Sequence, residues 1–334
     1  MNIYFVTSYG SIYNRVLPLI KEKGGDTIVV CTSLPIYRFF SEFTPYKTIY
    51  TRVNQNLITK RTWYMLIPNL IKQKSEYKQL FSNIKNANIY FFGIGWKIVT
   101  YMHIARLSKH NKVYLYPETQ SSTLGKIENT PKTKLMSFLI KLLTGLDMVV
   151  YTDCGKLSMN ISDKYLNKHN ITVIHKEFNK DNIDITIPID KDKYILVVTE
   201  DQVEYNRVTL SEMVKKMCSL DAILCSCHPG RYVIKPHPNT PKLYTNFHGK
   251  IISPYIPSEF LLKHPWKLII GTESLTLINA TKYTNAKVVS LLKFIKYKDP
   301  SVSQEFIDWM NKHTDKILFP ENEKELEEVI KSVS

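Results

Sequence analysis

The sequence has no long apolar segment and few cysteines. No window approaches the ~20 apolar residues that a membrane-spanning helix requires. The opening residues Met1–Val6 predict no signal peptide, because no charge precedes their short apolar run. The cysteines are odd in number and irregularly spaced: Cys31, Cys154, Cys218, Cys225 and Cys227. This pattern argues against a secreted disulfide framework and favours a reducing compartment, so we expect a cytoplasmic protein.

Complete metal-binding and nucleic-acid-binding patterns are also missing. The run Cys225-Ser226-Cys227-His228 lacks the second ligand pair that structural zinc requires. The run Asp190-Lys191-Asp192 has a lysine between its acids and lies in a polar segment, and we interpret it as solvated. No recognisable nucleic-acid-binding module is present. The sequence therefore predicts no metal site, no cofactor and no nucleic-acid partner.

The composition favours a folded, basic protein with anionic partners. An apolar fraction of 44% is enough for real cores, and 334 residues fit two domains of about 150 residues each. The net charge is +15, from 45 Lys and Arg against 30 Asp and Glu, and the basic residues are spread along the chain. Such an excess attracts nucleotide or acidic-sugar substrates and anionic membrane surfaces.

Short β-rich runs alternate with helical patterns in two series, which is typical of βα units and parallel sheets. The predicted strands are Ile3–Thr7, Thr27–Cys31, Lys47–Thr51, Ile89–Phe92, Lys112–Tyr116, Met148–Tyr151, Thr172–Ile174, Tyr194–Thr199, Tyr232–Lys235, Lys250–Ser253, Leu268–Ile270 and Lys287–Leu291. The predicted helices are Tyr13–Lys23, Trp63–Asn83, Lys97–Ser108, Lys132–Leu143, Lys156–Leu166, Leu210–Leu220, Ser258–Leu262, Ser274–Thr281, Ser303–Lys312 and Glu323–Ser332. The polar segment Lys176–Lys193 is interpreted as a linker. We predict an α/β fold with two Rossmann-like domains, residues 1–180 and 190–334, whose parallel sheets face a central cleft.

Ligands of open α/β sheets bind beyond the carboxyl ends of the strands. After Tyr232–Lys235 comes Pro236-His237-Pro238, where two prolines restrict the backbone on both sides of His237. A histidine held in this way, with Lys235 beside it, is suited to bind a phosphate; the alternative is a rigid surface turn. Thr199 ends another strand, where the backbone is expected to meet a nucleotide. The acids that follow, Glu200 and Asp201, are interpreted as helix caps.

A second strand end carries a run of small and hydroxyl residues. Gly271-Thr272-Glu273-Ser274-Leu275-Thr276 follows the strand Leu268–Ile270 and leads into a helix. The glycine permits a close turn. The free N–H groups of the helix start, together with the hydroxyls of Thr272, Ser274 and Thr276, would form an anion site. Simple N-capping by Thr272 or Ser274 is the alternative, and it is compatible with anion binding.

In the first half of the chain, a carboxylate follows the strand Lys112–Tyr116. Glu118 at that position could take a proton from an acceptor hydroxyl, or it could neutralise a nearby lysine. Asp153, after Met148–Tyr151, is a second candidate base, although a helix cap is the interpretation we favour. Gly93 and Gly95 follow Ile89–Phe92, where they would let the backbone approach an acceptor or pack a helix against the sheet.

These motifs together resemble the bacterial GT-B sialyltransferases, of the lipooligosaccharide sialyltransferase and capsular polysialyltransferase type. The resemblance rests on an acidic residue after a strand, then Lys235-Pro236-His237-Pro238, then Gly271-Thr272-Glu273-Ser274. It implies that Glu118 is the general base, that His237 contacts the CMP phosphate and that Ser274 helps to hold it. The chain departs from the family pattern in its acidic motif, Pro117-Glu118-Thr119, and in Leu275, which stands where a second hydroxyl residue is usual.

The resemblance implies inverting, metal-independent transfer of sialic acid or a related acidic sugar from a CMP-sugar to a glycan hydroxyl, in capsule or lipooligosaccharide biosynthesis. One alternative is a transferase or epimerase that uses CMP-Kdo or a UDP-sugar. Another is a non-catalytic protein that binds polysaccharide or membrane. The segment Lys132–Leu143 has a basic and an apolar side. Most such helices pack on their own sheet, which we favour; peripheral contact with the inner face of an anionic membrane is the alternative.

Overall fold

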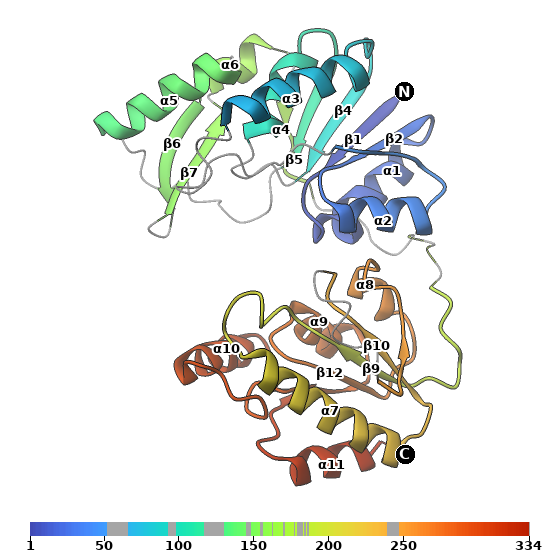
Figure 1. The fold of residues 1–334 in the computed structure, drawn as a ribbon. Coiled ribbons are helices and arrows are strands. Elements are labelled where there is room, and N and C mark those ends of the chain that lie inside the picture. The colour runs from blue at the N-terminus through green and yellow to red at the C-terminus, as the bar shows by residue number, and fades with distance from the viewer. Residues whose placement is uncertain are drawn as a thin grey trace. The chain divides into compact units, whose positions relative to one another are not determined.

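The computed structural model describes residues 1–51, 66–92, 98–116, 130–144, 148–153, 156–161, 163–169, 171–176, 178, 183, 185, 187–238 and 247–333. The chain forms two compact units, Met1–Asp184 and Ile185–Ser334 (Figure 1). The boundary between them falls inside the polar segment Lys176–Lys193. Within the described residues, no helix has both the length and the apolar character needed to cross a membrane.

The N-terminal unit is built on a six-stranded parallel sheet with the order β3-β2-β1-β4-β5-β8. Its strands are β1 Asn2–Val6, β2 Thr27–Cys31, β3 Lys47–Tyr50, β4 Asn88–Phe92, β5 Lys112–Tyr116 and β8 Ile171–Val173. The described helices are η1 Ile12–Val16, a π-helix, and α1 Leu17–Lys23, α2 Leu34–Phe43, α3 Leu66–Leu80, α4 Ile98–Leu107, α5 Pro131–Thr144 and α6 Asp163–Lys168. An antiparallel pair, β6 Met148–Asp153 and β7 Lys156–Ile161, follows α5.

Aromatic residues dominate the core of this unit. Every residue of β1 is buried, as expected for a parallel strand covered on both faces. Tyr4 stacks on Tyr90 of the neighbouring strand with ring centroids 4.8 Å apart, and Phe5 stacks on Phe91 at 4.4 Å. These pairs follow from the register, which places Tyr4 opposite Tyr90 and Phe5 opposite Phe91. Alternate side chains of one continuous apolar run therefore pack on opposite faces of the sheet.

The C-terminal unit repeats the same plan, with the strand order β11-β10-β9-β12-β13-β14 in a parallel sheet. Its strands are β9 Ile195–Val198, β10 Tyr232–Lys235, β11 Lys250–Ile251, β12 Leu268–Gly271, β13 Lys287–Ser290 and β14 Ile317–Leu318. The described helices are α7 Leu210–Cys227, α8 Ser258–Leu261, α9 Leu275–Tyr283, α10 Pro300–His313 and α11 Glu323–Lys331. In both sheets the order reverses beside the first strand of the unit, as in a doubly wound Rossmann fold. The predicted α/β class with two Rossmann-like domains is confirmed.

One predicted helix is wrong, and two elements were not predicted. The segment Lys156–Leu166 is not one helix: Lys156–Ile161 is a strand paired with β6, and only the residues from Asp163 are helical. Pairing with β6 overrides the helical pattern, and the two residues between the strands, Cys154-Gly155, match the commonest length of a hairpin connection. Helix α2 was not predicted, although Ser33 at its N-cap and a proline in its first turn are start signals. The two-residue strand β14 was also not predicted.

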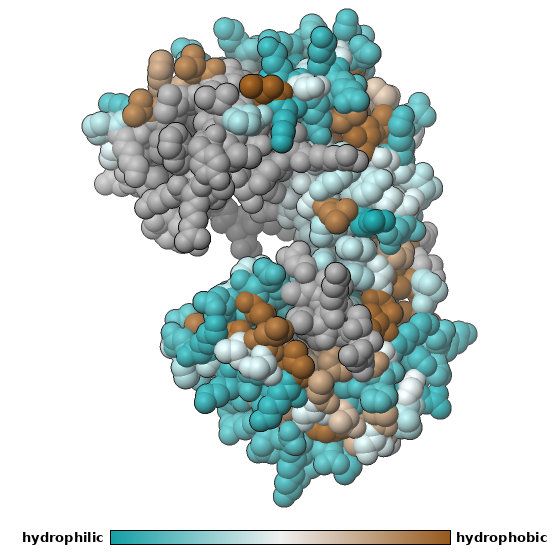
Figure 2. All heavy atoms as spheres, viewed as in Figure 1, coloured by the Kyte–Doolittle hydropathy of each residue, from teal (hydrophilic) through white to brown (hydrophobic). Residues whose placement is uncertain are grey.

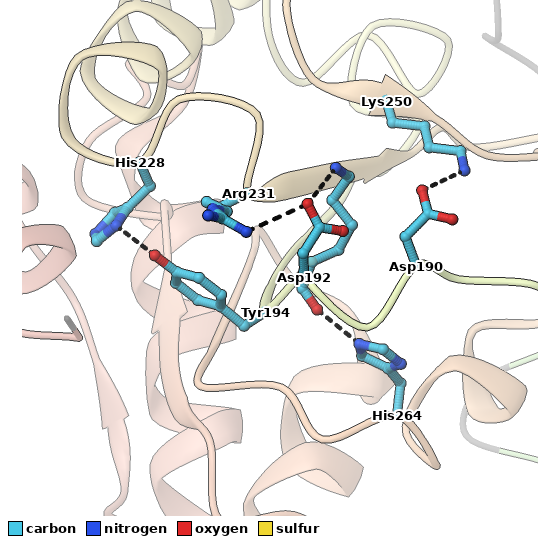
Figure 3. A network of polar contacts seen from close by, with 8 residues as sticks. Asp190, Asp192, Tyr194, His228, Arg231, Lys250 and His264 are labelled. Carbon is cyan, nitrogen blue, oxygen red and sulfur yellow. Dashed lines mark hydrogen bonds and ion pairs between the residues drawn. The ribbon is translucent and has the colours of Figure 1, made fainter.

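Both ends of the linker are fastened to the unit next to them. At the start, Lys176 Nζ lies 2.7 Å from Glu22 Oε2, and the Phe178 ring contacts Tyr116 with centroids 5.7 Å apart. At the end, the Asp190 carboxylate accepts from Lys250 Nζ at 2.9 Å and that of Asp192 from Arg231 at 3.3 Å (Figure 3). The acids of Asp190-Lys191-Asp192 are therefore ion-paired rather than simply solvated.

Two histidines at this end have structural partners. His264 Nε2 donates to the carbonyl oxygen of Lys193 at 2.6 Å. His228, at the end of α7, places Nδ1 2.9 Å from the Tyr194 hydroxyl (Figure 3). Its Nε2 lies 2.9 Å from the carbonyl oxygen of Ile330. Both ring nitrogens of His228 are thus occupied by protein groups. Among the described residues, no three His, Cys, Asp or Glu side chains gather in a way that could hold a metal ion.

Candidate active site

The carboxyl edge of the C-terminal sheet brings three of the predicted motifs together. The strand order reverses between β9 and β12, and ligands of doubly wound sheets bind beside such a reversal. Thr199 follows β9, Pro236-His237-Pro238 follows β10 on one side, and Thr272 to Ser274 follow β12 on the other. Residues from three distant parts of the sequence therefore share one edge.

His237 is held through both its backbone and its ring. Its N–H donates to the Thr199 hydroxyl at 2.9 Å, and the Thr199 N–H donates to the Lys235 carbonyl at 3.1 Å. Ring atom Nδ1 lies 3.5 Å from Oδ2 of Asp201, a buried carboxylate, while 24% of the His237 side chain remains exposed. Burial and the nearby Lys235 charge lower the pKa of His237, and Asp201 opposes them. The ring is therefore oriented by the protein and still open to a ligand.

Lys235 supplies a buried cation beside this ring. Only 6% of the residue is exposed. Burial lowers the pKa of its ammonium group to about 8, and the charges of Glu200 and Glu259 act in the opposite direction. A buried ammonium in the field of two carboxylates is available to a bound anion without reorganisation of solvent.

Glu200 and Asp201 are not the helix caps that the sequence suggested. Helix α7 begins at Leu210, and its N-cap is Thr209, whose hydroxyl accepts from the Glu212 N–H at 3.2 Å. Asp201 instead lies beside the His237 ring, and Glu200 lies near Lys235. Burial raises the pKa of the Glu200 carboxyl, and a hydrogen bond from Ser274 and the Lys235 charge lower it. The sequence identified Lys235 and His237, but it did not indicate that Glu200 and Asp201 lie beside them.

Ser274 combines helix capping with a place in the site. Its hydroxyl oxygen accepts from the Thr276 N–H at 3.2 Å, which caps α9, and its side chain also hydrogen-bonds Glu200. The start of α9 therefore presents N–H groups and a hydroxyl at the same edge as His237. Thr276 is buried, and its hydroxyl lies 2.6 Å from that of Ser258 on α8. This contact joins α8 and α9.

Gly271 and Thr272 occupy the most crowded part of the turn. A Cβ at Gly271 would lie 2.8 Å from Val198 Cγ2 and 3.2 Å from Leu277 Cδ2, so the glycine lets β9 and α9 pack closely. The glycine is the last residue of β12 rather than the first of the turn. Thr272 is buried, and its carbonyl accepts from the Ser290 hydroxyl at 2.6 Å.

An ion pair that the sequence analysis missed supports the turn from one side. Arg207 pairs with the largely buried Glu273, and its guanidinium lies over the rings of Tyr205 and Phe306, 5.1 and 4.9 Å from their centroids. Burial raises the pKa of Glu273 against the charge of Arg207. Arg207 lies between Asn206 and Val208, in a stretch with no recognisable motif, so no local pattern marked it.

Four of the predicted site residues belong to the N-terminal unit. Glu118, Gly93 and Gly95 lie outside the described residues. Asp153 is the last residue of β6, where it is the register partner of Lys156. The favoured interpretation of Asp153 as a helix cap is therefore wrong, because a strand follows it.

The described site has the properties of an anion-binding edge. It offers one buried ammonium, one oriented imidazole, one hydroxyl and the amino end of α9, with carboxylates behind them. A phosphate placed here would meet donors from several directions, and its negative charge would raise the pKa of His237. Such a site can hold a phosphate and stabilise charge that develops on it.

Comparison with known proteins identifies the family. The profile of the family described as alpha-2,8-polysialyltransferase (POLYST) matches residues 29–293. No curated protein sequence matches the chain significantly. Among solved structures, the spinosyn rhamnosyltransferase SpnG complexed with thymidine diphosphate is 11% identical, with 100% of this chain and 90% of that chain covered and a TM-score of 0.47. The UDP-GlcNAc 2-epimerase of Methanocaldococcus jannaschii is 14% identical, with 100% and 92% covered and a TM-score of 0.46.

Proposed function

Because the chain belongs to the alpha-2,8-polysialyltransferase family and is therefore a glycosyltransferase, we propose that it transfers sialic acid, or a related acidic sugar, from a CMP-activated donor to a glycan hydroxyl. The observation that carries the proposal is the cluster of Lys235, His237 and Ser274 at the strand-order reversal of the C-terminal sheet. In this proposal the acceptor belongs to a capsular polysaccharide or lipooligosaccharide, and synthesis takes place in the cytoplasm.

The donor phosphate occupies the edge formed by these three residues. Lys235 and the amino end of α9 attract its charge, and the Ser274 hydroxyl turns from Glu200 towards it. Thr199 and Pro238 fix the His237 turn, while Gly271, Thr272 and Thr276 shape the opposite turn. In this scheme protein cations balance the negative charge of the leaving group, and no metal ion is required.

Transfer inverts the anomeric carbon in a single displacement. Glu118 takes the proton of the acceptor hydroxyl, whose oxygen bonds to the anomeric carbon on the face opposite the phosphate. The bond between that carbon and the phosphate oxygen breaks, and its electron pair stays on CMP. Protonated His237 donates a hydrogen bond or its proton to this oxygen, so its contribution is largest in the transition state.

Asp201 has a positioning role in this scheme. With Nδ1–H directed towards Asp201, the His237 ring presents Nε2 to the phosphate. In the free protein, burial and Lys235 favour the neutral ring. The bound phosphate adds a negative charge, which favours the protonated ring that the leaving group needs. Donor binding and protonation of His237 are therefore coupled.

Release of CMP from CMP-sialic acid tests the proposal. We expect His237→Ala to lower kcat by about two to three orders of magnitude, the loss typical of one preorganised donor, with a smaller change in KM. His264→Ala is the matched control, because it removes another His-Pro histidine of the same unit, and we expect kcat to be unchanged. Equal kcat for His237→Ala and the wild type would contradict the role of the ring.

Inhibition by free nucleotides tests the choice of donor. We expect CMP to inhibit far better than UMP or UDP. The reverse order, with activity on a UDP-sugar, would replace the sialyltransferase assignment with the alternative of another donor or of epimerisation. Binding of acidic glycan that His237→Ala leaves intact, without any donor cleavage by the wild type, would indicate a non-catalytic protein.

A further inference from the structure

Helix α5 presents apolar side chains to solvent. Leu135, Phe138 and Leu142 are spaced along one face of the helix, and 58%, 61% and 71% of these residues are exposed. Figure 2 shows brown surface at the upper left, over the position of α5 in Figure 1. Side chains of this size are normally placed against a sheet or another helix. Helix α5 does pack against α4 and β6, as expected, but these three residues lie outside that packing.

The same helix carries only positive charge. Pro131–Thr144 contains Lys132, Lys134 and Lys141 and no Asp or Glu. Lys134 and Lys141 are exposed next to the apolar residues. Helix α3, in the same helical layer through α4, adds the exposed Ile71. An apolar stripe flanked by lysines is the pattern of a helix that lies in the surface of an anionic bilayer.

The net positive charge of the protein lies almost wholly in the unit that carries α5. Residues 1–184 hold 25 Lys and Arg against 12 Asp and Glu, whereas residues 185–334 hold 20 against 18. Between residues 52 and 141, 15 basic residues face 3 acidic ones. The basic residues are spread along the chain, but the acids that balance them are concentrated in the C-terminal unit.

From these observations we propose that helix α5 docks the N-terminal unit on an anionic lipid bilayer, with Leu135, Phe138 and Leu142 inserted among the acyl chains and the lysines at the headgroups. The charge of the unit brings the protein to the surface, and the apolar stripe holds it there. Neither step involves the residues of the candidate active site.

Flotation with vesicles tests the proposal. We expect the full chain to bind vesicles that contain phosphatidylglycerol and to bind vesicles of pure phosphatidylcholine much more weakly. Leu135→Ser/Phe138→Ser/Leu142→Ser should lower the partition coefficient about 100-fold, since partial burial of each side chain contributes several-fold. The control Leu210→Ser/Val214→Ser changes exposed apolar residues of α7 in the other unit and should bind as the wild type does.

A second pair of variants separates charge from insertion. Lys134→Glu/Lys141→Glu should weaken binding mainly at low salt, because headgroup attraction is screened over about 10 Å at 0.1 M salt, while the stripe variant should remain weak at any salt. Failure of the wild type to bind anionic vesicles, or equal binding by a correctly folded stripe variant, overturns the proposal. Binding of a soluble acidic polysaccharide without any vesicle binding also overturns it and assigns the charge of this unit to a glycan.

Discussion

Substitution of Gly271 tests how the turn beside β12 is built. In Gly271→Ala the new Cβ would lie 2.8 Å from Val198 Cγ2 and 3.3 Å from the Val198 carbonyl oxygen. The first separation is below any normal carbon contact, and Val198 is itself buried in β9. The strand or the side chain must therefore move. Overpacking of this kind costs about 1–3 kcal/mol.

The expected result is a lower melting temperature without loss of the fold. For a unit of about 150 residues, each kcal/mol corresponds to roughly 2–4 °C, so Tm should fall by about 2–12 °C. Differential scanning calorimetry measures this directly. Gly10→Ala is the control, because a Cβ at Gly10 meets no atom within 4 Å, and it should change Tm little. Equal melting temperatures for Gly271→Ala and the wild type would refute the packing argument.

Two further substitutions give independent tests. Asp201→Asn removes the charge that raises the pKa of His237 and leaves burial and Lys235, which lower it. The protonated fraction of His237 then falls at any given pH, so the decline of kcat/KM with rising pH should move to lower pH; an unmoved profile would exclude Asp201 as the positioning group. Asn322→Ala removes the oxygen that accepts from the Glu325 N–H at 3.0 Å at the start of α11, and urea denaturation should show a loss of about 1 kcal/mol. Asn322→Asp keeps that acceptor and should be close to the wild type, so an equal loss in both variants would argue against the cap.

The strands were predictable because buried parallel strands are continuous apolar runs bounded by polar residues. Thr27–Cys31, Lys112–Tyr116 and Tyr232–Lys235 were predicted to the residue for this reason. Strand β7 was not, since its sequence is mixed and its conformation depends on pairing with β6. The local apolar pattern is sufficient where most of a strand is buried, and tertiary pairing decides the conformation where the sequence is mixed.

The site was predictable only in its sequence-local parts. Prolines on both sides of His237 and a glycine before Ser274 can be recognised in the chain itself. The partnership of Asp201 with His237 cannot, because it depends on the register that sets Val198 of β9 opposite Lys235 of β10. An acid after a strand has the same local sequence whether it caps a helix or faces a charge on the next strand.

Each end of the linker is held by contacts with the unit next to it, which shortens the segment that joins the two units. Lys176 and Phe178 are attached to the N-terminal unit, and Asp190 and Asp192 to the C-terminal unit. Releasing Asp190 and Asp192 from Lys250 and Arg231 would add up to about 3.3–3.6 Å of reach for each freed residue. The effective concentration of one unit around the other falls as a flexible connection lengthens beyond the span it must cross. Loss of the surface ion pairs of Asp190 and Asp192 would therefore lengthen the connection between the two units.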